Sequence, residues 1–243
     1  MYQKRSYRNL FGNELVMFDV CIGETDLRLG CDRDLTDVAL RSVRKARAVI
    51  STHIENHPVF RTSMIPLETN PVYHPIINKM IEAGIAAGTG PMAAVAGAIA
   101  QYTGEALLEY SIQVFVENGG DIFFASNKDR VIGIYAGNSS LTGKLAIRIA
   151  SESFPLGICT SSGTVGHSFS MGRADAVTVL ARDTALADAV ATAAGNMIRN
   201  PKDIKEALEF AMGIKGVAGI LAIIGDKLGA AGEIELAAPG NQG

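Results

Sequence analysis

The sequence has no tryptophan, only three cysteines and comparatively few charged side chains. Without tryptophan, a base-stacking surface for nucleic acids would depend on six tyrosines and nine phenylalanines, which do not cluster at the spacing of an RNA-recognition motif. The net charge of −3 also argues against a protein that binds nucleic acid by bulk electrostatics. An odd number of cysteines without paired spacing is typical of a reducing compartment, so we expect a cytoplasmic protein.

Charged residues make up 19% of the chain, against about 25% in ordinary domains. The surface is therefore small or partly covered, which favours a homo-oligomer. The 243 residues are 48% hydrophobic and can bury a large core without disulfides or metal ions. We expect a single module of two lobes over residues 1–238 and a flexible tail over residues 239–243.

An uninterrupted apolar run is also missing. Residues 83–104 carry no charge, and a stretch of about 20 residues is enough to span a bilayer. Several glycines and Pro91 interrupt this stretch, however, and most of its bulk is alanine, which buries little apolar area. We therefore expect a loop that enters a buried helix and no contact with a membrane. The N-terminus lacks the apolar core of a signal peptide.

Alternating and helical patterns follow one another along the chain. They predict a hairpin of strands at residues 16–22 and 27–31, and helices at residues 34–56, 74–86 and 184–199. Asn200 and Pro201 begin a last helix that ends at Gly213. Further strands are expected at residues 112–117, 122–125, 131–136, 144–150, 157–160 and 176–181, with a closing hairpin of residues 217–224 and 233–237. Strands mixed with helices, without strict β-α-β alternation, predict an α+β fold.

The first motif that could carry chemistry is Asn118-Gly119-Gly120-Asp121, which lies between two apolar runs. Glycines permit positive φ angles and let the backbone approach a ligand closely, while Asn118 and Asp121 add an amide and a carboxylate. The same residue types are also the usual composition of a β-turn that only connects two strands. Taken alone, the motif favours the simple turn.

A second motif, Gly88-Thr89-Gly90 followed by Pro91, leads into the start of a helix, where free N–H groups and the positive dipole end attract anions. A tight loop between two buried helices accounts for it equally well. The third motif is Cys159-Thr160-Ser161-Ser162-Gly163, whose hydroxyl groups could bind phosphate or ribose oxygens. Cys159 with His167 suggests a thiol nucleophile and a base, but a small buried core residue is the better interpretation of Cys159.

The fourth motif is a pair on the helix predicted at residues 184–199. Asp188 and Thr192 are four residues apart and therefore share one face of the helix. They could simply face water. The same face carries only small uncharged residues otherwise, which suggests that something packs against it. A carboxylate and a hydroxyl are suitable oxygen ligands for Mg²⁺.

In order along the chain, these motifs resemble the ApbE-like family, the FAD:protein FMN transferases. The resemblance covers residues 85–200 and is carried by Gly119-Gly120-Asp121, the Thr160-Ser161-Ser162-Gly163 stretch, His167, the strand at residues 176–181 and Ala187-Asp188-Ala-Val-Ala-Thr192. It is closer still to an uncharacterised ApbE-related branch. The marks of that branch are Gly90-Pro91-Met92-Ala93-Ala94-Val95-Ala96-Gly97 and Val116-Glu117-Asn118-Gly119-Gly120-Asp121.

The resemblance implies a two-lobed α+β fold of the tunnelling-fold type, with antiparallel sheets, packed helices and a cleft between the lobes. It implies that the cleft binds FAD, FMN or a related nucleotide, and that Asp188 and Thr192 hold a divalent metal such as Mg²⁺ near the pyrophosphate. The residues that it places around the flavin are Gly119, Gly120, Asp121, Thr160, Ser162 and Gly163.

Two departures from the transferases bear on the reaction. The transferases carry a Lys-Gly pair in their first glycine-rich segment, where this chain has Gly90-Pro91. They also carry a stretch ending in Asp-Pro-Arg-Thr-Gly, where this chain runs His167-Ser-Phe-Ser-Met-Gly-Arg173. Three functions therefore stay open. The chain is an enzyme that acts on a flavin nucleotide with Mg²⁺, a non-catalytic nucleotide-binding protein, or an accessory protein of anaerobic sulfur assimilation that works with a partner in homocysteine formation.

Overall fold

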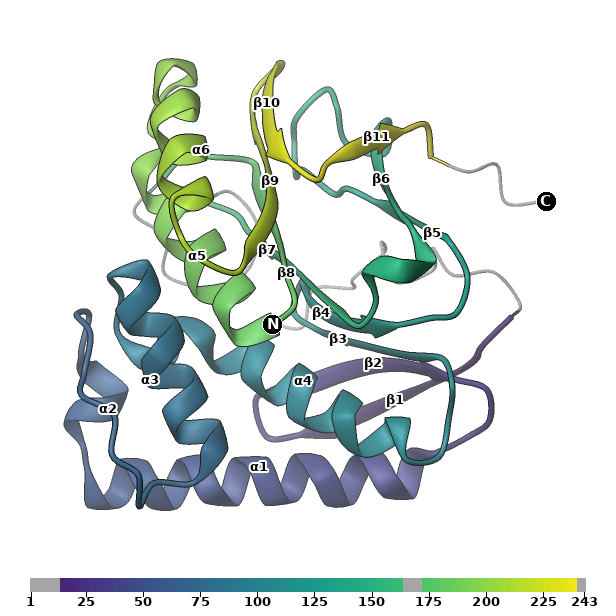
Figure 1. The fold of residues 1–243 in the computed structure, drawn as a ribbon, viewed down its shortest axis with the longest axis vertical. Coiled ribbons are helices and arrows are strands. Elements are labelled where there is room, and N and C mark those ends of the chain that lie inside the picture. The colour runs from purple at the N-terminus through teal and green to yellow at the C-terminus, as the bar shows by residue number, and fades with distance from the viewer. Residues whose placement is uncertain (1–13, 164–171, 240–243) are drawn as a thin grey trace.

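The computed structural model describes residues 14–163 and 172–239. It contains two antiparallel sheets, and the helices pack against the larger one (Figure 1). The helices are α1 (Thr36–Asn56), α2 (Val59–Thr62), α3 (Pro75–Ala87), α4 (Val95–Leu108), α5 (Thr184–Met197) and α6 (Ile204–Met212), with short 3-10 helices η2 (Pro91–Ala94), η3 (Ser151–Ser153) and η4 (Pro201–Asp203). The strands are β1 (Val16–Ile22), β2 (Thr25–Cys31), β3 (Val114–Asn118), β4 (Asp121–Ala125), β5 (Arg130–Gly133), β6 (Ala146–Ile149), β7 (Leu156–Ser161), β8 (Ala176–Ala181), β9 (Val217–Ile224), β10 (Lys227–Gly232) and β11 (Glu235–Ala237).

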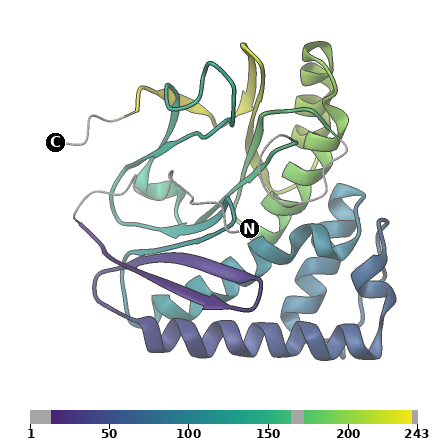
Figure 2. The same cartoon turned by 180° about the vertical axis from the view of Figure 1, so that it is seen from behind.

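The larger sheet has eight strands in the order β1-β2-β3-β4-β7-β8-β9-β10, and the smaller has three in the order β11-β6-β5. Every neighbouring pair is antiparallel. The helices cover one face of the larger sheet and the smaller sheet lies over part of the other face (Figures 1 and 2). The predicted α+β class with antiparallel sheets and packed helices is confirmed. The division into two lobes stays a prediction, and most of the predicted tail lies outside the described residues.

The turn between β3 and β4 is a two-residue hairpin loop. Asn118 and Asp121 are paired across it, and Gly119 and Gly120 both have positive φ angles, 72° and 110°. Two successive positive φ angles match the twist of an antiparallel hairpin, and glycine adopts them without strain. The sequence therefore builds a sharp turn here that carries no side chain between two polar residues.

The uncharged stretch at residues 83–104 forms the end of α3, η2 and the first part of α4. As expected, it turns at a loop and enters a largely buried helix that packs on β3, β4 and α5. Among the described residues, no single helix is both long and apolar enough to cross a membrane. The stretches Pro75–Ala87 and Pro91–Leu108 pass that test only when taken together, and they are bent by 107° at the break between them.

The predicted closing hairpin is wrong. Strand β9 pairs with β10, and the following strand β11 leaves the larger sheet and pairs with β6 in the smaller one. The segment Lys227–Gly232 contains two glycines and two alanines, so its sequence lacks the β-branched and aromatic residues that mark a strand. Gly232, with a φ of 75°, turns the chain out of the sheet against the backbone of Ala218.

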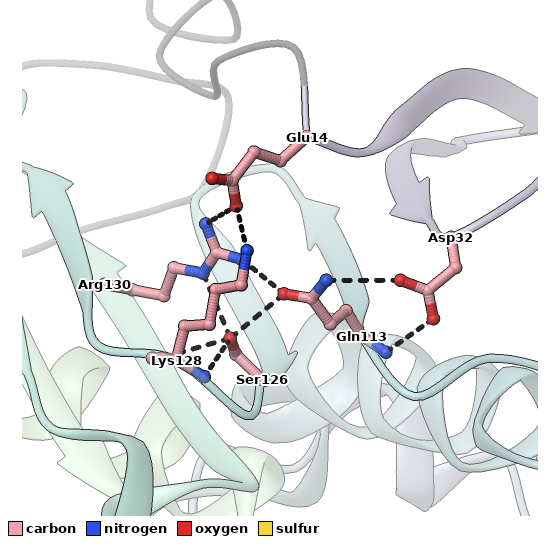
Figure 3. Close-up of polar contacts among 6 residues, drawn as sticks. All are labelled: Glu14, Asp32, Gln113, Ser126, Lys128 and Arg130. Atoms are coloured by element: carbon pink, nitrogen blue, oxygen red, sulfur yellow. Dashed lines mark hydrogen bonds and ion pairs between the residues drawn. The ribbon is translucent and has the colours of Figure 1, made fainter.

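A polar network ties together the ends of β2, β3, β4 and β5 (Figure 3). The carboxylate of Asp32, just after β2, accepts hydrogen bonds from the backbone N–H groups of Ile112 (2.8 Å) and Gln113 (3.1 Å). It also accepts from the Ser111 hydroxyl (2.9 Å) and the Gln113 side-chain amide (3.2 Å). Burial alone would raise the pKa of Asp32, but these hydrogen bonds outweigh it and lower that pKa.

Arg130 is the second centre of this network. Its guanidinium donates to the carboxylate of Glu14 (3.0 Å), to the hydroxyl of Ser126 (3.0 Å) and to the side-chain carbonyl of Gln113. Lys128 contacts the same Glu14 carboxylate at 3.3 Å. The Arg130 side chain is 17% exposed whereas that of Lys128 is 56% exposed, so water screens the lysine far more strongly.

We predict that Arg130→Ala lowers the free energy of unfolding by about 1–3 kcal/mol, because the buried Gln113 carbonyl loses its charged donor. Lys128→Ala is the matched control and should change the free energy of unfolding by less than about 0.5 kcal/mol. Urea denaturation followed by far-ultraviolet circular dichroism measures both values. Equal effects of the two substitutions would show that the network adds no stability beyond its exposed ion pairs.

Candidate functional site

Four of the residues singled out from the sequence converge between the β3–β4 turn and helix α5. Asn118 ends β3, Asp121 begins β4, and Asp121 is paired in register with Cys159 of β7. The Cys159 thiol donates to the backbone carbonyl of Thr184 at the start of α5 (3.4 Å) and is also hydrogen-bonded to Asp121. Asp188 of α5 lies close enough to Asp121 for its charge to affect the pKa of that group. The four side chains are buried.

Asp188 also meets the beginning of helix α4. Its Oδ2 atom accepts a hydrogen bond from the backbone N–H of Gly97 (2.8 Å), and the N–H of Ala96 bonds to the same carboxylate. These N–H groups belong to the first turn of α4, where no carbonyl of the helix itself is available to them. The side-chain amide of Asn118 donates to the carbonyl of Ala96 (3.1 Å). The first turn of α4 is thus held between Asn118 on one side and Asp188 on the other.

The two carboxyl groups are unusually hard to ionise. Burial raises the pKa of Asp188 to about 7, although the bonds from Gly97 and Ala96 act in the opposite direction. Burial, and then the negative charge of Asp188, raise the pKa of Asp121 well above its ordinary value. Over residues 14–163 and 172–239, no lysine or arginine is among the main causes of either shift. A cation placed between these groups would therefore favour the ionised form of both.

The protein alone supplies few ligands for such a cation. Over residues 14–163 and 172–239, no group of three or more His, Cys, Asp or Glu side chains is arranged to hold a metal ion. Thr192 is half-buried one helical turn beyond Asp188 and could add a hydroxyl. The remaining ligands would have to be backbone carbonyls, water or oxygens of a bound phosphate. Mg²⁺ is commonly bound in this way, by one or two carboxylates together with substrate phosphates.

The hydroxyl-rich stretch lies beside the glycine turn. The backbone N–H of Thr160 donates to the carbonyl of Gly120 (3.2 Å), Ser161 ends β7, and Ser162 follows it. The Thr160 hydroxyl is 2.9 Å from that of Thr178 on β8, while Ser161 lies against α5 near Gly195. The structure therefore brings the Gly-Gly turn, the Thr160–Gly163 stretch and Asp188 into one region.

The predicted motif at residues 88–90 has a structural explanation of its own. Gly88 follows the last residue of α3 and has a left-handed conformation. Gly90 packs so tightly on the segment after α2 that a Cβ atom on it would lie 1.8 Å from the Ser63 carbonyl oxygen. These contacts account for both glycines as a loop between helices, and anion binding there stays a prediction. His167 lies outside the described residues.

Sequence reasoning missed two buried polar residues next to the site. Glu117, 2% exposed, accepts a hydrogen bond from the N–H of Gly120 (2.8 Å) and so holds the glycine turn. Gln101 of α4 accepts from the N–H of Thr184 (2.8 Å) at the start of α5. The available signal for Glu117 was a single charge inside the apolar run Val114–Asn118. Gln101 gave no signal, because its partner is 83 residues away.

Cys159 matches the interpretation as a core residue. Its side chain is completely buried, and burial followed by the charges of Asp121 and Asp188 raises its pKa well above the ordinary value. A reactive cysteine needs a lowered pKa and access to solvent, because the thiolate is the nucleophile. Both conditions are absent for Cys159.

We predict that Asp188→Asn stabilises the metal-free protein above neutral pH, by roughly 1–3 kcal/mol. Asparagine keeps an oxygen for the Gly97 N–H but removes a buried charge. Because the folded-state pKa of Asp188 is raised, the wild type loses stability as pH rises from 3.8 to about 7, and the variant should lose less. Thermal melting of both proteins across this pH range, with a chelator present, measures the difference. A gain that is equally large below pH 3.8 would contradict a role for the charge.

The sequence has close relatives across its length. A family model described as AbpE bacteria matches residues 8–228. A UPF0280 protein of Methanocaldococcus jannaschii is 42% identical over 221 residues, which are 88% of this chain and 90% of that protein. A UPF0280 protein of Methanocella arvoryzae is 37% identical over 214 residues, which are 88% of this chain and 87% of that protein.

Solved structures share the fold at much lower identity. The flavinyl transferase ApbE of Pseudomonas stutzeri has a TM-score of 0.57 at 12% identity, with 91% of this chain and 95% of that one covered. A mutant of the flavin transferase ApbE of Vibrio cholerae has a TM-score of 0.58 at 11% identity, with 90% and 97% covered. The chain therefore has the fold of the ApbE flavin transferases and belongs to the family described as AbpE bacteria.

Proposed function

We propose that this protein binds FAD, or a closely related flavin nucleotide, together with Mg²⁺ held at Asp188 and Thr192. An acceptor hydroxyl would form a phosphoester with the FMN part of FAD, the pyrophosphate bond would break, and AMP would leave. The observation that carries the proposal is the pair of buried carboxyl groups, Asp121 and Asp188, beside the glycine turn to which the backbone of Thr160 bonds. Perturbed carboxyl groups without a cationic partner are common at functional sites. The flavin itself is suggested by the ApbE fold that the chain shares with flavin transferases.

The donor set suits Mg²⁺ better than a softer metal. Asp188 and Thr192 both offer oxygen, while the sulfur atom of Cys159 is kept protonated by burial. The raised pKa of Asp188 means that burial disfavours its negative charge, which a bound cation would offset. A bound Mg²⁺ would supply Lewis-acid polarisation of a phosphoryl oxygen.

The chain's own groups would position the nucleotide around that metal. Gly119 and Gly120 carry no side chains, so a flat ring can approach the backbone of the turn. Glu117 keeps the turn in place through the N–H of Gly120. Thr160 and Ser161 project to opposite faces of β7, so the stretch offers hydroxyls both toward Thr178 and toward α5.

Binding without transfer is the second candidate. It is favoured by the first glycine-rich segment, where Gly90 is packed on the backbone of Ser63 and Met64 and no lysine follows. The accessory role in sulfur assimilation stays a prediction, and the buried thiol of Cys159 gives it no local support.

The first test is the coupling of flavin and metal binding. Isothermal titration calorimetry should show that Mg²⁺ tightens the binding of FAD to the wild type by about tenfold or more, ~1.4 kcal/mol. Asp188→Asn and Thr192→Val should abolish this gain, because each removes a metal ligand. Asp37→Asn, on the exposed side of α1, is the control and should keep the gain intact. An affinity for FAD that does not change with Mg²⁺, or no binding of FAD, would disprove the metal-dependent site.

The second test separates transfer from binding. The wild type, FAD and Mg²⁺ are incubated with a protein known to accept covalent FMN, and the acceptor is examined by intact-mass spectrometry. We expect the acceptor to gain the mass of one FMN, and to gain none when Asp188→Asn replaces the wild type. Tight Mg²⁺-dependent binding of FAD with no mass gain would establish the binding-only alternative.

A further inference from the structure

A cavity of about 380 Å³ lies between the two sheets, away from the site described above. Its floor is formed by Leu156, Leu180 and Ala218 of the larger sheet. Ile149 of the smaller sheet and Ile234, in the link to β11, face them from the other side. These side chains belong to the apolar core between the sheets or pack against it. The volume falls within the range of small-molecule sites, about 300–1,000 Å³.

The larger sheet separates this cavity from Asp121 and Asp188. Successive side chains of a strand point to opposite faces, so Leu156 and Ile158 on β7 face the smaller sheet, whereas Gly157 and Cys159 face α5. The same alternation puts Leu180 on the cavity side of β8 and Val179 on the helix side. None of the residues proposed for the flavin nucleotide and the metal lines the cavity.

The mouth of the cavity carries more negative than positive charge. Arg148 is the single basic residue in the lining, and its guanidinium already contacts Glu235 (Nε to Oε1, 3.2 Å) and Asp129 (Nη1 to Oδ2, 3.8 Å). Glu233 adds a further carboxylate to the lining. Within the part of the chain that the structure describes, Glu233 takes part in no ion pair. The mouth therefore offers a carboxylate to a cation, while its one arginine is already neutralised.

We propose that this cavity binds a small molecule with an apolar body and a single cationic head, such as a hydrophobic primary amine. The body would pack against Leu156, Leu180 and Ile149, and the ammonium group would lie at the mouth beside Glu233. The walls come from both sheets, and Glu235 of β11 is paired in register with Arg148 of β6. The bound molecule would therefore hold the C-terminal strand against the rest of the fold.

The experiment compares three probes of equal chain length: hexylamine, hexanol and hexanoate. Each is titrated into the full chain, and binding is followed by two-dimensional amide NMR. We expect shift changes confined to β6, β7, β8, β9 and β11, with hexylamine bound about tenfold more tightly than hexanoate, because an attraction at Glu233 replaces a repulsion. No binding of hexylamine, or equal binding of hexylamine and hexanoate, would overturn the proposal.

Two variants sharpen the result. Glu233→Gln keeps the shape of the mouth and should reduce the preference for hexylamine to about threefold or less, whereas Glu206→Gln on the exposed side of α6 should leave it unchanged. Ala218→Leu should fill the floor and abolish the binding of hexylamine and hexanol alike. Should that variant fail to fold, the Glu233→Gln comparison alone decides the matter. An unchanged preference in Glu233→Gln would rule out the proposed position of the head group.

Discussion

The contact between helices α4 and α5 at Gly97 determines the geometry of the candidate site. A Cβ atom on residue 97 would lie 2.4 Å from the carbonyl oxygen of Thr184 and 2.8 Å from the Cβ of Asp188, so only glycine permits this approach. Because the helices come so close, the carboxylate of Asp188 reaches the N–H groups of the first turn of α4. Asn118 donates to the carbonyl of Ala96 in that turn. The first turn of α4 therefore links the β3–β4 hairpin to Asp188 of α5.

This arrangement buries two carboxyl groups, Asp121 and Asp188, where the ionised form of each is disfavoured. The positive end of the α4 dipole and the N–H groups of Ala96 and Gly97 favour ionised Asp188, but burial outweighs both and the pKa is raised to about 7. At Asp121 the Cys159 thiol and the backbone N–H of Thr160 oppose the same effect. A large apolar core can tolerate such a cost, and a protein that never bound a cation here would gain stability by replacing one of the two acids. This cost is what the proposed cation site would offset.

Local chemistry made much of the structure predictable. The β1–β2 hairpin, the glycine turn after Asn118, the capping box at Asn200 and the buried run at residues 83–104 all depend on neighbours in sequence. Strand β10 was not predicted, because its alanines and glycines lack the alternation of apolar and polar residues that marks a strand. The contacts that complete the site join residues far apart in the chain. Gly97 to Asp188 spans 91 positions and Gln101 to Thr184 spans 83, so no spacing could reveal them.

Strand β7 shows how one segment serves two separate regions. Leu156 and Ile158 face the cavity and core between the sheets, while Cys159 faces α5 and the two carboxyl groups. Gly157 has to be glycine because a Cβ atom there would lie 2.6 Å from the Cα of Thr184, at the start of the helix that carries Asp188. A shift of one residue in the pairing of β7 would exchange the two faces, so that the Cys159 thiol would enter the apolar core and Ile158 would take its place beside Asp121. The tight contact at Gly157 opposes that shift, because no other residue of β7 fits against Thr184. It therefore fixes which side chains of β7 face each of the two regions.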